Sequence, residues 1–142
     1  MSRRLDDLRT LHPAYFALVM ATGIVSIAAT LMRMRAFALV LLVINVIAYV
    51  VLWVLTFIRI VRFPRDVFAD LIDHQRGVGF FTTVAATSVL GSQLIVVVGS
   101  YHIAMALWWI TVALWLGLIY AVFTALTVKE VKPSLDQGIS GG

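Results

Sequence analysis

Four long apolar segments, none of which contains a charged side chain, fill most of this 142-residue chain. They cover residues 13–32, 36–58, 77–98 and 103–128. A helix rises about 1.5 Å per residue, so about 20 residues cross a hydrocarbon layer of roughly 30 Å. With 62% hydrophobic and 13% charged residues, a water-soluble bundle would lack the polar surface that it needs. The pattern therefore predicts an all-α membrane protein with four transmembrane helices.

These helices are expected to form two tandem helical hairpins within a single membrane domain, residues 1–142. Hairpin 1 covers about residues 13–60 and hairpin 2 about residues 77–128. An elbow at residues 61–76 joins the hairpins, and a C-terminal tail follows at residues 129–142.

The basic residues lie mostly on one side of the predicted spans. The N-terminus, the loop between the second and third segments, and the tail carry Arg3, Arg4, Arg9, Arg59, Arg62, Arg65, Arg76, Lys129 and Lys132. Only Arg33 and Arg35 lie on the other side. The positive-inside rule then places both termini in the cytoplasm, in a multi-pass protein of the cell (inner or plasma) membrane. Topology and anionic lipid also account for the net charge of +4, so no nucleic-acid partner is expected.

The elbow combines apolar, acidic and basic side chains at helical spacing. Val67 and Leu71 would share one face of a short helix, while Asp66, Asp70 and Asp73 would lie on another face, beside the arginines. This spacing predicts an interfacial helix or a salt-bridged elbow.

The four predicted helices are of two kinds. Gly, Ala, Ser and Thr make up roughly half of the first and third segments, whereas all four tryptophans lie in the second and fourth. Small residues allow helices to approach closely, while bulky apolar and aromatic residues suit lipid. We therefore expect the first and third helices inside and the others outside. Residues 16–23 also resemble residues 81–88, sharing Phe, Val, Ala and Thr, which suggests a hairpin repeat.

Small and hydroxylated residues meet near the middle of the first and third helices, and so near the bilayer midplane. The candidate substrate pathway consists of Thr22, Gly23, Ser26, Thr83, Thr87, Ser88 and Gly91. Such residues can line a polar pathway, but they are equally typical of close helix packing with hydroxyls bonded to the preceding turn. Both interpretations remain open from the sequence.

Other polar residues point less strongly to a function. Asn45 and Gln93 could contact a substrate, but single amides in membrane helices more often bond neighbouring helices. His12, His74 and His102 lie at helix ends and cannot form a facing pair that would hold a haem. The chain has no cysteine and no cluster of acids and nucleophiles, so we expect no enzyme activity, no metal and no cofactor.

The opening helix carries a resemblance to a known family. Residues 12–26, with Pro13, an aromatic, Phe16 and then Met20-Ala21-Thr22-Gly23, resemble the first helix of the tellurite-resistance/dicarboxylate transporter family. This family includes the plant slow-type anion channels. Residues 79–83, Gly-Phe-Phe-Thr-Thr, are similar to the start of its third helix.

The resemblance implies a ring of five helical hairpins whose odd helices line an anion pathway, of channel or carrier type. It implies transport of small anions of the C4-dicarboxylate, tellurite, sulfite or halide class. Because this chain carries two hairpins, we expect it to be the N-terminal portion of such a ring. The remaining helices of a longer protein, or a homo-oligomer, would complete the ring, and membrane lipid would surround it.

Two alternatives belong to other classes. A non-transporting assembly or accessory protein would also need helices rich in small residues. A small multidrug-type exporter would have four helices as well, but such exporters need an acid within the membrane, and the predicted spans contain none.

Overall fold

The described part of the chain is entirely helical. The structure, a computed structural model, describes residues 13–72, 77 and 79–128. Its elements are the 3-10 helix η1 (Pro13–Tyr15) and the α-helices α2 (Phe16–Leu31), α3 (Arg35–Arg62), α4 (Pro64–Ile72), α6 (Phe81–Val98) and α7 (Tyr101–Val128). The predicted tail and the positions of His12, Asp73 and His74 lie outside the described residues.

Three of these helices are long and apolar enough to cross a membrane, namely α3, α6 and residues 101–124 of α7. Helix α2 is apolar but has only 16 residues, which give about 24 Å of rise. The three residues of η1 directly precede it and add about 6 Å. The length of a bilayer core is therefore reached in the first segment only when η1 and α2 are taken together.

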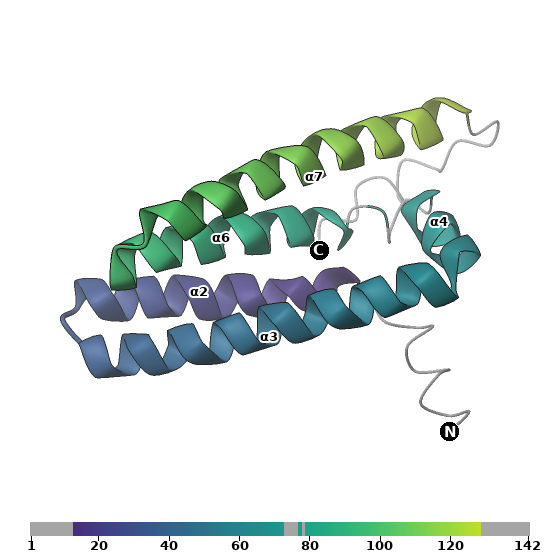
Figure 1. The fold of residues 1–142 in the computed structure, drawn as a ribbon. Coiled ribbons are helices and arrows are strands. Elements are labelled where there is room, and N and C mark those ends of the chain that lie inside the picture. The colour runs from purple at the N-terminus through teal and green to yellow at the C-terminus, as the bar shows by residue number, and fades with distance from the viewer. Residues whose placement is uncertain (1–12, 73–76, 78, 129–142) are drawn as a thin grey trace, which may run out of the picture.

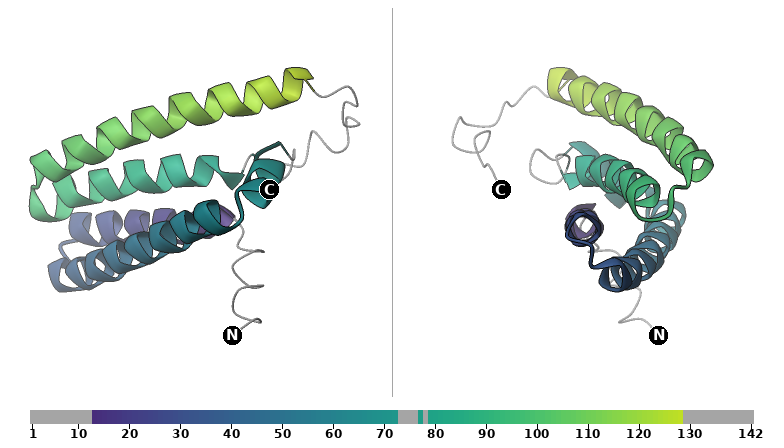
Figure 2. Two further views of the ribbon diagram at one scale, coloured as in Figure 1. Left: turned by 45° about the vertical axis from the view of Figure 1, so that its right-hand side comes forward. Right: turned by 90° about the vertical axis from the view of Figure 1, so that its left-hand side faces the viewer.

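Helices α2 and α6 lie side by side in the middle of the bundle, as Figures 1 and 2 show. Helix α3 packs against α2 and touches α6, while α7 packs against α6. Helix α4 lies at one end of the bundle and contacts both α3 and α7. Buried residues make up a larger share of α2 and α6, the two helices rich in small residues, than of α3.

Two tight turns close the opposite end of the bundle. Between α2 and α3, Arg33 adopts a left-handed φ of 63° and its N–H bonds to the Thr30 carbonyl. Between α6 and α7, Gly99 has a φ of 71°, and the Ser100 N–H reaches back to Leu94 O at 3.1 Å. The Gly99 N–H also bonds to Ile95 O at 2.9 Å, which makes this an αL cap, in which glycine takes the left-handed position without a steric cost.

Apolar contacts gather in two small clusters around α2. One contains Phe16, Val19 and Ala86, with Tyr49 and Trp53 of α3 packed against it. The other contains Ala29, Ala38, Leu42 and Val97. Most large side chains of α3 and α7 are exposed, including Trp108, Trp109 and Trp115. Such a surface suits lipid contact rather than water.

Candidate functional site

The seven predicted pathway residues come from two helices in direct contact. Thr22, Gly23 and Ser26 belong to α2, and the other four belong to α6. Their environments differ, however. Thr22 is half-buried and Ser88 is exposed, whereas the other five are buried. The surroundings of each residue therefore decide whether it packs helices together or lines an open groove.

Ser26 connects the two helices of the first hairpin. Its Oγ donates a hydrogen bond of 2.8 Å to the carbonyl oxygen of Ala38 in α3. The Ser26 carbonyl in turn accepts a bond of 3.0 Å from Thr30 Oγ1. The Ser26 hydroxyl is fully buried between α2 and α3, so it bonds one helix to the other.

Gly23 lies against a buried pair of amides. Asn45 Nδ2 of α3 donates to Gln93 Oε1 of α6 at 2.7 Å, and both side chains are fully buried. A Cβ atom at position 23 would lie 3.1 Å from Asn45 Nδ2 and 3.4 Å from Gln93 Oε1. Glycine at this position therefore leaves room for the amide pair. The interhelical role predicted for these two amides is confirmed.

Thr83 and Thr87 form a short chain of hydroxyl bonds along α6. Thr83 Oγ1 donates to Phe80 O at 2.6 Å, and Thr87 Oγ1 donates to Thr83 O at 2.7 Å. Because the Thr87 hydroxyl uses its proton in this way, the Tyr49 hydroxyl of α3, at 2.9 Å, donates to Thr87 Oγ1. This interaction bonds α3 to α6.

A groove of about 490 Å³ runs between α6 and α7. It is lined by Thr87, Ser88, Gly91, Ser92, Ile95, Tyr101, Ala104, Met105 and Trp108. Three of the seven predicted residues therefore lie on one wall of one groove. Ser88 and Ser92 are exposed, and Ser92 Oγ donates to Ser88 O at 3.1 Å. The floor of the groove is narrow because the backbone of Gly91 lies against Ala104.

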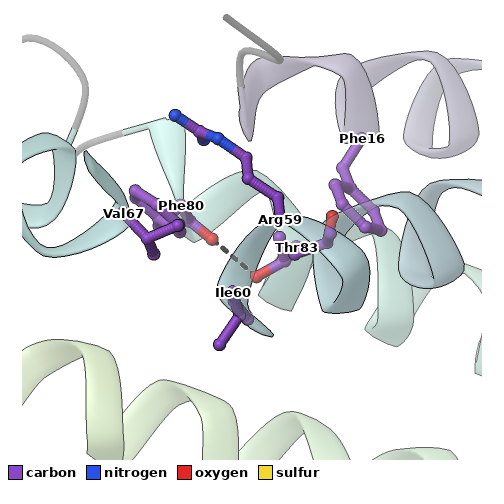
Figure 3. Close-up of a pocket in the computed structure, with 7 residues that line it drawn as sticks. Phe16, Arg59, Ile60, Val67, Phe80 and Thr83 are labelled. Atoms are coloured by element: carbon purple, nitrogen blue, oxygen red, sulfur yellow. Dashed lines mark hydrogen bonds between the residues drawn. The ribbon is translucent and has the colours of Figure 1, made fainter. Parts of the chain in front are cut away.

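A second, much smaller cavity of about 20 Å³ lies at the end of the bundle that carries α4. Its walls are Phe16, Thr56, Arg59, Ile60, Val67, Phe80 and Thr83, and Figure 3 shows six of these side chains labelled around it. Arg59 is only 3% exposed and forms an ion pair with Asp70 of α4. The salt-bridged elbow predicted from the sequence is confirmed for this pair.

The burial of Arg59 is a feature that sequence reasoning missed. The sequence predicts that Arg59, Arg62 and Arg65 are all charges at the membrane surface. Arg62, one turn after Arg59 on α3, is exposed as expected, but Arg59 is buried. The available signal was the position of Arg59, which follows Ile58 at the end of an unbroken apolar segment.

Among the described residues, no group of three or more His, Cys, Asp or Glu side chains comes together, and His102 is exposed at the start of α7.

Comparison with known proteins gives one match. Residues 10–136 match the family model SLAC1, described as voltage-dependent anion channel. No curated protein and no solved structure matches the chain. The match covers both hairpins, including every residue that lines the groove and the small cavity.

Proposed function

The chain belongs to the voltage-dependent anion channel family, and from this premise we propose that it passes small anions along a pathway lined by α2 and α6. Membership of this family makes the chain a membrane protein of anion transport. The proposed substrates are small anions of the C4-dicarboxylate, tellurite, sulfite or halide class. The proposed pathway residues remain Thr22, Gly23, Ser26, Thr83, Thr87, Ser88 and Gly91.

The observation that carries the proposal is the pair of exposed hydroxyls on the wall of the groove. Ser88 and Ser92 lie near the middle of α6, a helix of membrane length, where lipid offers no hydrogen-bond partner. Hydroxyl and backbone donors can replace part of the water around an anion. Ser88, and Ser92 when it gives up its bond of 3.1 Å to Ser88 O, would offer such donors without a fixed charge, which favours weak and fast passage over tight binding.

The charge distribution supports selection of anions. The described residues of α2, α6 and the middle of α3 contain no carboxylate or ammonium group, whereas Arg59, Arg62 and Arg65 gather near α4. Such a cluster raises the local concentration of anions at that end. We place this end in the cytoplasm, together with both termini, and we count η1 with α2 as the first of four spans.

The open side of the groove supports a further part of the proposal. Among the described residues only α6 and α7 bound the groove, so α6 is the part of the proposed pathway that lines it, and the pathway is not enclosed by the described residues alone. Further helices, supplied by a longer protein or by other copies of this chain, would close the pathway into the five-hairpin ring that the resemblance implies.

Flux measurements in proteoliposomes test the proposal. Vesicles with the complete chain, alone and with any further helices encoded with it, should show chloride or succinate flux without potassium flux. The double substitution Ser88→Ala and Ser92→Ala should change the ratio of chloride to succinate flux. Thr127→Ala is the matched control, because Thr127 is an exposed hydroxyl of α7 outside the groove, bonded to Phe123 O. Potassium flux without anion flux would contradict the proposal.

A second candidate, a non-transporting assembly protein, is favoured by one observation. Gly23, Ser26 and Thr87 are fully engaged in contacts with neighbouring helices, as close packing requires. If Ser26→Ala and Thr87→Val leave every anion flux unchanged but lower the thermal stability, the packing role is the correct one for these residues.

A further inference from the structure

The ion pair between Arg59 and Asp70 joins two elements that meet only at the end of the bundle. Arg59 lies in the last turn of α3 and is 3% exposed, and Asp70 lies in α4 and is 9% exposed. A buried guanidinium without a negative partner is strongly destabilising, so Arg59 requires an anion beside it. In the structure, this anion is the carboxylate of Asp70.

We propose that Arg59 is an anion-binding residue at the entrance of the pathway, and that Asp70 is a built-in competitor that occupies Arg59 until a substrate anion displaces it. The inference rests on the proposed function, because it names a binding residue for the same anions. It also assigns α4 a role as a gate, since Asp70 is part of this helix.

The chemistry of the pair matches that of the proposed substrates. A guanidinium binds carboxylates and oxyanions through directed N–H donors, and it keeps its charge at every physiological pH. The side chain of Asp70 ends in the same group as a C4-dicarboxylate. A free dicarboxylate and Asp70 therefore compete for one partner, and the tethered group has the advantage of a high effective concentration.

The neighbouring cavity explains how displacement would open the entrance. Its volume of about 20 Å³ has room for a single water molecule, so it cannot admit a dicarboxylate as it stands. Val67, which forms part of its wall, lies three residues before Asp70 on α4. Release of Asp70 from Arg59 would free α4 to move Val67 away and widen the cavity. Thr56 and Thr83 on its other walls carry hydroxyls.

The first test measures binding without transport. The complete chain in mild detergent is heated at increasing concentrations of sodium succinate, with sodium chloride at equal ionic strength as the reference. Asp70→Asn removes this competing carboxylate from Arg59, so the unfolding midpoint of the variant should rise steeply with succinate. If Asp70 occupies Arg59 for about nine-tenths of the time, the succinate concentration that gives half of the full shift in midpoint should be about tenfold lower in this variant than in the wild type.

Two further variants keep the test decisive. The double variant Arg59→Gln with Asp70→Asn removes both charges and should fold, because neutral replacement of a buried pair is often tolerated. Its midpoint should not respond to succinate. Arg62→Gln removes an exposed charge one turn away and should respond like the wild type. Equal responses of Asp70→Asn and the double variant would overturn the proposal, and so would an Asp70→Asn protein that folds in neither succinate nor chloride.

The second test separates this inference from the proposed function. Asp70→Asn should increase succinate flux at low substrate concentration, while Arg59→Gln should reduce it more than Arg62→Gln does. If the wild type passes anions and Arg59→Gln behaves like Arg62→Gln, the entrance site is wrong and the proposed function stands. If succinate stabilises Asp70→Asn but no chain passes any anion, the binding site stands and the proposed function fails.

Discussion

Gly23 offers the sharpest test of how α2, α3 and α6 pack. In Gly23→Ala, the new Cβ would lie 2.6 Å from Val89 Cγ1, closer than such atoms approach in proteins. It would also lie 3.1 Å from Asn45 Nδ2. Val89 is β-branched and has few alternative rotamers, so α2 and α6 must separate or the amide pair must shift.

The expected change in the free energy of unfolding follows from one stabilising and two destabilising terms. Alanine improves the helix interior by about 1 kcal/mol relative to glycine. Overpacking a close helix contact costs about 1–3 kcal/mol, and weakening the bond between Asn45 and Gln93 costs about 1 kcal/mol more. We expect a net destabilisation of about 2 kcal/mol, which is roughly a 30-fold change in the unfolding equilibrium.

A matched control is present on α7. A Cβ at Gly117 would meet no atom within 4 Å, so Gly117→Ala gains the same backbone term without a clash. It should be as stable as the wild type or up to about 1 kcal/mol more stable. Unfolding in mild detergent, followed by circular dichroism and by tryptophan fluorescence, measures both variants.

A rescue variant completes the experiment. Val89→Ala removes the atom nearest to the new Cβ, so Gly23→Ala with Val89→Ala should be more stable than the sum of the two single effects by about 1 kcal/mol or more. If Gly23→Ala is as stable as Gly117→Ala, or if Val89→Ala brings no rescue, the close contact between α2 and α6 described above is wrong.

Three further predictions concern other contacts. Tyr49→Phe removes the bond to Thr87 and should cost about 0.6–1.7 kcal/mol in thermal or denaturant unfolding, whereas Tyr120→Phe, at an exposed site of α7, should cost nothing measurable. Gly99→Ala forces a side chain into the left-handed region and should destabilise the chain by about 1–2 kcal/mol, with Gly99→Asn milder; equal stability of the two variants would contradict the cap. In a chain without cysteine, Ser100→Cys should react with impermeant thiol reagents on intact cells, and Arg65→Cys only with permeant ones; the reverse pattern would invert the proposed topology.

Hydropathy predicts the helices well because an uncharged apolar segment of membrane length is enough to identify a spanning helix. The second, third and fourth uncharged segments correspond to α3, α6 and α7, although α3 continues past Ile58 to Arg62. That extension is physically reasonable, since arginine side chains at helix ends can reach the interface. A contact between the arginines and the acids of this region was also predictable, because the two kinds of charge lie close together in the sequence on either side of the break between α3 and α4.

The rotation of each helix could not be predicted. The polar residues of α6 are spread around the helix and α7 has few of them, so no single polar face shows which residues point to a neighbour. The sequence shows Ser26 and Ser88 as similar small polar residues, and only the structure shows that Ser26 is buried against α3 while Ser88 is exposed in the groove. The pairing of Asn45 with Gln93 likewise depends on how α3 and α6 are turned, which needs all three helices at once.

The bundle is very unequal at its two ends. One end carries α4, while the other has only the turns Met32–Met34 and Gly99–Ser100 between its helices. A protease or an antibody needs several accessible residues in an extended or loop conformation, and turns this short offer almost none. The chain should therefore resist proteolysis from that side even in the native membrane. An affinity tag inserted there would have to break a helix cap, so the elbow side is the place to put one.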